Sequence, residues 1–190
     1  MLARQKLPII VLAQFACTSL WFAGNAVMPD LIAEFNYPAG SVAHTTSFVQ
    51  FGFIIGTLIF AIFSFADKIS PSKVFFVSAI LAALANFSSQ YVAGSMPLLL
   101  TFRFVTGFFL AGIYPVGMKI AADYHEKGLG KALGFLVGAL VVGTAFPHLL
   151  RSLTNSLPWQ QVIIGTSIAA FAGGLMILLL VLPLHQYRVF

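Results

Sequence analysis

The sequence predicts an all-α, polytopic membrane protein: six transmembrane helices in a 3+3 repeat bundle with both termini cytoplasmic. Hydrophobic residues make up 59% of its 190 residues and charged residues only 8%, with a mean hydropathy of +0.97. Soluble domains carry about a quarter charged residues. Six apolar runs are each long enough to cross a bilayer, which takes about 20 residues. The basic residues fall between these runs rather than on one face, which argues against a nucleic-acid partner.

The six runs define the expected helices. They cover roughly residues 8–28, 44–65, 74–93, 97–118, 132–150 and 160–183. We expect a single six-helix domain over residues 1–190, because no other segment is long enough for a soluble domain. The first run is too long for a signal peptide and five more follow, so we expect it to be a retained span. Short links between the runs predict antiparallel neighbours.

Basic residues predict the orientation of the helices. Eight of the ten fall on one side if both termini are inside: Arg4, Lys6, Lys68, Lys73, Lys119, Lys127, Lys131 and Arg188. The opposite side receives only Arg151. Because lysine and arginine concentrate in cytoplasmic loops, we expect cytoplasmic termini and a multi-pass location in a bacterial-type inner (plasma) membrane.

The first and fourth runs share a short pattern that supports the repeat. Ala23-Gly24 precedes Pro29, and Ala111-Gly112 precedes Pro115. Three-plus-three repeats with helices interrupted by glycine and proline are typical of transporters. A mid-helix proline also simply kinks a helix, so this pattern alone leaves both interpretations open.

Arg103 stands inside the fourth run, roughly 9 Å into the span, where a charge costs about 2–3 kcal/mol. The acidic residues all lie in loops or at helix ends; they are Asp30, Glu34, Asp67, Asp123 and Glu126. Arg103 therefore needs neutral acceptors such as Gln50, Asn25 or backbone carbonyls, a carboxylate from another chain, or an anionic substrate. A structural arginine and a substrate-binding or coupling arginine are both compatible with this pattern.

Four further residues are candidates to line a cavity near the midplane with Arg103. Trp21 and Asn25 are one turn apart and share a face of the first helix, and Gln50 and Tyr114 stand in the second and fourth. The alternative is that these side chains only pack helices together. The sequence contains no HExxH, CxxC, GxSxG or P-loop motif. We therefore expect no enzymatic activity, no metal and no cofactor.

Three segments resemble the major facilitator superfamily. The loop "FSFADKISPSKV" is similar to the family's signature loop, with Asp67, Lys68 and Lys73 at its charged positions, although Phe63 replaces its leading glycine. The stretch "RFVTGFFLAG" resembles the family's RxxxG pattern through Arg103 and Gly107. The segment "HEKGLGKALGF" resembles the loop and helix that follow. Nearly the whole chain resembles the N-terminal six-helix half of such a transporter.

This resemblance implies transport of a small solute, with an anion or a metabolite as the candidates, by alternating access. The chain would be one half of a twelve-helix assembly, its partner a copy of itself or a separate chain. In the family, the loop aspartate (here Asp67) meets a helix end of the other half. The implied gating residues are Asp67, Lys68, Lys73, Asp123, Glu126 and Lys131. The alternative is a non-transporting accessory subunit, or an isolated half-transporter fragment.

Overall fold

The computed structural model describes residues 6–125, 128–153 and 158–181 and contains only helices within them. The elements are α1 (Lys6–Phe35), α2 (Ser41–Phe63), α3 (Phe65–Lys68), α4 (Pro71–Ser88), the 3₁₀ helix η2 (Ser89–Val92), α5 (Met96–Leu110), α6 (Tyr114–Tyr124), α7 (Leu129–Leu153) and α8 (Gln160–Leu180). These form six segments long and apolar enough to span a membrane, with α4 and η2 making one and α5 and α6 another. The predicted all-α polytopic membrane fold is confirmed.

Proline explains where several helices begin, and where one span breaks. Pro71, Pro97 and Pro115 each occupy one of the first two positions of a helix, where a missing N–H costs no intrahelical bond. The span expected over residues 97–118 is divided: α5 ends at Leu110 and α6 begins at Tyr114. Because Pro115 cannot donate to the carbonyl four residues earlier, the chain turns there. In α1, by contrast, Pro29 lies inside the helix, which continues to Phe35.

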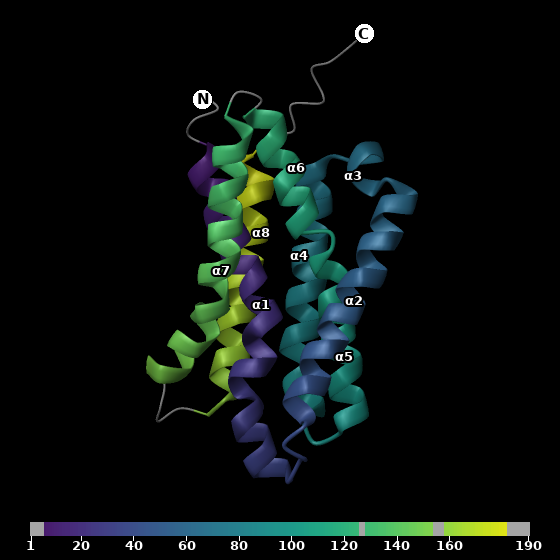
Figure 1. Ribbon diagram of the computed structural model, residues 1–190, viewed down its shortest axis with the longest axis vertical. Helices are drawn as coiled ribbons and strands as arrows, with labels where there is room; N and C mark the ends of the chain where they lie inside the picture. Colours follow the sequence, from purple (N-terminus) through teal and green to yellow (C-terminus); the bar gives the residue numbers. More distant parts are fainter. Residues whose placement is uncertain (1–5, 126–127, 154–157, 182–190) are drawn as a thin grey trace.

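The helices pack in a bundle with α1, α7 and α8 on one side and α2, α4, α5 and α6 on the other (Figure 1). α2 and α4 both pack on α5, α4 also packs on α8, and α1 packs on α7 and α8. The starts of α1 and α7, the end of α6 and the short α3 lie at one end of the bundle, at the top of Figure 1. The core of the bundle is formed by fully buried apolar side chains such as Ile10, Phe75, Leu110 and Ile113.

The α2–α5 contact depends on two glycines. A Cβ atom at Gly107 would fall on the carbonyl oxygen of Val49, and one at Gly52 would fall on the carbonyl oxygen of Phe104. The two backbones therefore approach as closely as small residues allow in membrane helix pairs.

Two spans are much less buried than the rest. Only 17% of the most apolar stretch of α2 and 22% of that of α7 is buried, against 56% for the span that begins with α4. Ile54 and Ile62 on α2 and Val141 and Val142 on α7 are all 60% exposed or more. These helices form the two flanks of the bundle, with α1 between them (Figure 1).

Candidate functional site

Arg103 is held at the centre of the bundle by neutral groups. Its side chain is only 1% exposed. One terminal nitrogen donates to the carbonyl oxygen of Leu20 at 3.1 Å and to Oδ1 of Asn86 at 3.4 Å, and the other donates to the carbonyl oxygen of Trp21. Of the acceptors expected from the sequence, α1 carbonyls serve, whereas Asn25 and Gln50 do not bond to Arg103. No carboxylate of the described residues pairs with it.

The guanidinium fits because α1 has a glycine opposite it. A Cβ atom at Gly24 would lie 2.8 Å from Nε and 2.9 Å from Cζ of Arg103, closer than real Cβ contacts allow. The Nε atom has no hydrogen-bond acceptor among the described residues. The missing side chain of Gly24 therefore leaves the space that the guanidinium occupies against α1.

Asn86 on α4 is the member of this centre that the sequence analysis missed. Its side-chain amide donates to Ser167 Oγ at 3.0 Å and to Thr166 Oγ1 and the Ile163 carbonyl at 3.3 Å, all on α8. Since its oxygen accepts from Arg103, one amide joins α5 to α8. The sequence does indicate such a role: Asn86 is an amide well inside the third apolar run, and an amide there needs internal partners in lipid.

Two of the predicted cavity residues, Trp21 and Asn25, contact α2, and a third, Gln50, lies one turn beyond Thr46 on α2. These three residues are here called the α1–α2 seam (Trp21, Asn25, Gln50). The Thr46 hydroxyl donates to Oδ1 of Asn25 at 3.1 Å. The Trp21 ring packs edge-on against Phe53, with centroids 5.0 Å apart. Gln50 stands between Thr46 and Phe53 on α2 and is exposed. Arg103 bonds to carbonyls of the same stretch of α1 but has no exposed surface at the seam.

Tyr114, the fourth predicted cavity residue, lies elsewhere. It is the first residue of α6 and is half-buried. Among the described residues, no hydrogen bond or ring contact joins it to the seam.

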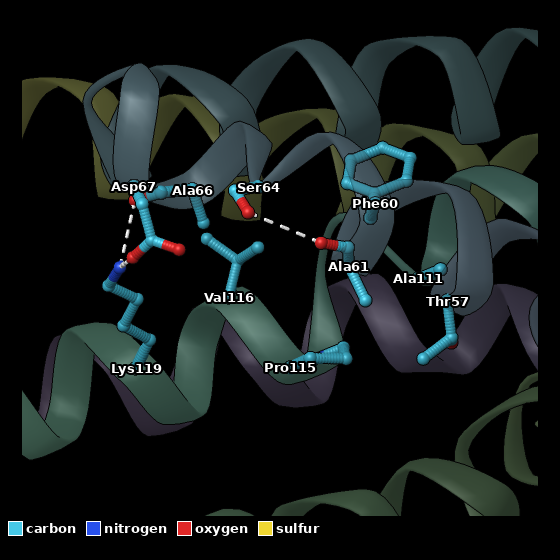
Figure 2. Close-up of a pocket in the computed structure, with 10 residues that line it drawn as sticks. All are labelled: Thr57, Phe60, Ala61, Ser64, Ala66, Asp67, Ala111, Pro115, Val116 and Lys119. Carbon is cyan, nitrogen blue, oxygen red and sulfur yellow. Dashed lines mark hydrogen bonds and ion pairs between the residues drawn. The ribbon is translucent and has the colours of Figure 1, made fainter.

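A second polar contact links α3 to α6 at the end of the bundle (Figure 2). Lys119 forms an ion pair with Asp67 and donates to the Ala66 carbonyl at 3.0 Å. The side chains of Lys119 and Asp67 are 30% and 67% exposed, respectively. They border a pocket of about 220 Å³ that continues past Ser64, Pro115 and Thr57. Lys119 was not among the gating residues predicted from the sequence.

The other predicted gating residues are separate from this pair. Lys68, Lys73, Asp123 and Lys131 are exposed, and their side chains form no hydrogen bond or ion pair with any described residue. Glu126 lies outside the described residues.

The opposite end of the bundle carries a matching set of polar contacts. Arg151 near the end of α7 forms an ion pair with Asp30 near the end of α1. The indole nitrogen of Trp159, just before α8, donates to Oε2 of Glu34 at 2.7 Å. These contacts fasten α7 and α8 to α1 at that end.

The family model for the Major Facilitator Superfamily matches residues 10–188. One relative is the "Putative metabolite transport protein YyaJ" of Bacillus subtilis (strain 168), which is 23% identical over 147 residues. That match covers 75% of this chain but only 32% of the relative, so the chain matches about a third of the relative's length.

Proposed function

The chain belongs to the major facilitator superfamily, and on that basis we propose that it transports a small solute across the membrane by alternating access. The single observation that carries this proposal is the family match over residues 10–188, which includes five of the six spans in full and all but the first four residues of α1. We further propose that the chain acts as one six-helix half of a twelve-helix assembly. Its partner half would be a second copy or a different chain.

For the substrate class we propose a small metabolite, with anions as the first group to test. The relative's name refers to metabolite transport, and we extend that to this chain. The net charge of +5 favours an anionic solute, because a positively charged protein raises the local concentration of anions.

We place the end that carries α3 and the end of α6 in the cytoplasm. The basic residues at the start of α1, in α3 and at the start of α4 gather at this end, as the positive-inside rule requires. The Arg151–Asp30 pair then faces outward.

We propose that the solute contacts the α1–α2 seam. The amides of Asn25 and Gln50 supply both donors and acceptors, and Trp21 supplies an apolar wall, which is the usual composition of a small-molecule site. Tyr114 would contribute its hydroxyl from α6. Arg103 would not contact the solute but would position the site. By binding the Leu20 and Trp21 carbonyls it fixes the stretch of α1 that presents Trp21 and Asn25.

The Asp67–Lys119 pair supports a gating role for the cytoplasmic end. An ion pair this exposed contributes at most about 1 kcal/mol, so it can form in one state and break in the other. Once released, the Asp67 carboxylate could meet a helix N-terminus of the partner half, where the helix dipole favours a negative charge. Lys68, Lys73, Asp123, Glu126 and Lys131 would add charges to the same gate.

The test combines assembly and uptake. Native mass spectrometry of gently extracted protein should show an assembly heavier than one 20.5 kDa chain. Reconstituted vesicles should then take up a labelled small anion from a panel of lactate, succinate and phosphate, or a neutral metabolite from a parallel panel.

Two variants test the site. Gln50→Leu, and Arg103→Gln with normal membrane insertion, should each abolish most of the uptake. Phe51→Leu is the control, because Phe51 is the exposed neighbour of Gln50 on α2. Normal uptake in both site variants would refute the site. A single chain that transports nothing would refute the proposed function and favour an accessory role.

A further inference from the structure

A groove on the outside of the bundle is a second candidate binding feature. It is separate from the seam, and it ends at Lys73, one of the residues of the proposed gate. α2 and α4 both pack on α5 and leave between them a groove of about 520 Å³. Phe108 and Phe109 of α5 form its floor, Ile59 of α2 one wall, and Val77 and Leu81 of α4 the other. Val77 is 52% exposed and Leu81 37%, so the groove opens to the surface of the spans.

The groove is apolar along its length and cationic at one end. Lys73, Val77 and Leu81 are spaced four residues apart and share one face of α4. The lysine therefore stands at the end of an apolar strip about 12 Å long. Its ammonium forms no hydrogen bond or ion pair with any described residue. Lys68, in the short α3 next to this end, is likewise exposed and without such a partner among the described residues.

The neighbouring carboxylate does not neutralise these lysines by direct contact. Asp67 is paired instead with Lys119 of α6 (Figure 2). The end of the groove thus carries Lys73, with Lys68 in the adjoining α3, and no acid of the described residues is bonded to either lysine.

We propose that this groove binds one anionic phospholipid. An acyl chain lies along Val77 and Leu81 over the phenylalanine floor, and the phosphate contacts Lys73 and Lys68. Charge complementarity supports this occupant, because an apolar groove that ends in lysines matches a molecule with an apolar tail and one negatively charged head group. A free anionic solute would leave the apolar part of the groove unfilled, and a neutral lipid would leave the lysines without a negatively charged partner. The proposal does not depend on transport, because its readout is lipid binding.

The first experiment measures lipid binding by native mass spectrometry of the protein in detergent. The probes are phosphatidylglycerol and phosphatidylcholine with identical acyl chains. Wild-type protein should retain phosphatidylglycerol preferentially. Lys73→Gln should weaken its binding about five-fold and the Lys68→Gln/Lys73→Gln double variant about 25-fold, since each lysine near a membrane surface contributes about that factor.

Two variants separate head-group attraction from binding in the groove. Val77→Trp fills the apolar part of the groove and leaves both lysines in place, so it should weaken phosphatidylglycerol binding as strongly as Lys73→Gln. Lys131→Gln removes an exposed lysine at the start of α7, outside the groove, and should leave lipid binding unchanged. Equal binding of both lipids, unchanged binding in Val77→Trp, or equal losses in Lys131→Gln and Lys73→Gln would each overturn the proposal.

A cross-linking experiment tests the occupant in the native membrane. A photoreactive residue at position 77 should yield an adduct with the mass of an anionic phospholipid. An adduct with a protein segment would show that a partner chain covers the groove, and would also overturn the proposal. Folding of every variant is checked through Cys17, whose thiol is fully buried in the intact bundle and reacts with a maleimide dye on unfolding.

Discussion

Helices α5 and α7 contain the same residue types, arginine and glycine, but these residues are enclosed by neighbouring helices in α5 and largely open in α7. Each contains one arginine, and glycine occurs in both. In α5, Arg103 is 1% exposed and Gly107 lies against the backbone of Val49. In α7, the Arg151 side chain is 30% exposed. A Cβ atom added at Gly134 or at Gly138 of α7 would meet no described atom within 4 Å.

The difference shows that residue type alone does not assign a role within a membrane helix. An arginine or glycine stabilises the bundle only where neighbours enclose it, and α5 lies between α2 and α4, whereas α7 flanks the bundle. Four predictions test this contrast, beginning with the largest effect. Each is measured by the denaturation of detergent-solubilised protein, followed through the reactivity of the buried Cys17 thiol.

Replacing the two arginines should give the largest difference. Arg103→Ala leaves a cavity at a fully buried position and removes a charged donor from Asn86, so we expect a loss of about 4 kcal/mol in the free energy of unfolding. Arg151→Ala, the control, removes a partly exposed ion pair and should cost about 1 kcal/mol or less. If Arg103→Ala were as stable as the wild type, desolvation of the guanidinium would outweigh its hydrogen bonds.

The glycines should separate in the same direction. Gly107→Ala forces a methyl group onto the Val49 carbonyl and should lower the free energy of unfolding by about 2–3 kcal/mol, because α2 must move away from α5. Gly134→Ala, in open surroundings on α7, should raise it by about 0.5 kcal/mol through better helix propensity. Similar effects at both sites would contradict the close approach of α2 and α5.

Asparagines extend the comparison to the neighbours of α5. Asn86→Leu breaks the hydrogen bonds that link α4 to Arg103 and α8, and should cost about 1–2 kcal/mol, near the upper limit for polar contacts between membrane helices. Asn25→Leu loses a single bond from Thr46 and should cost about 0.6 kcal/mol. Equal costs would show that the central network adds nothing beyond one ordinary hydrogen bond.

The smallest effect is expected at the Asp67–Lys119 pair. Lys119→Gln should lower the free energy of unfolding by about 0.5 kcal/mol at low salt, because the pair is largely solvated. Raising the salt to about 1 M, where charges are screened within roughly 3 Å, should remove most of the difference. The exchange Asp67→Lys/Lys119→Asp should restore part of the stability. A large, salt-independent loss would mean that Lys119 acts through packing instead.

Much of the architecture could be predicted because it depends on local composition. Apolar runs of about 20 residues must become helices in lipid, since every backbone group needs an internal partner there. The absence of a carboxylate from the middle of every span likewise implied that Arg103, if paired within this chain, would use neutral acceptors. The resemblance to the family was visible in residues close together in sequence, such as Asp67 with Lys73 and Arg103 with Gly107, and the match of the family model over residues 10–188 confirms it.

Other features, such as the partners of buried polar side chains, depend on contacts between helices that are far apart in the sequence. Arg103 bonds to the Leu20 carbonyl, 83 residues away, and Asn86 bonds to Ser167, 81 residues away; no local pattern selects such partners. The sequence likewise showed glycines in both α5 and α7 but not which of them touch another backbone. Composition determines which segments enter the membrane, whereas the acceptor of a buried charge and the enclosure of a small residue depend on the three-dimensional packing of whole helices.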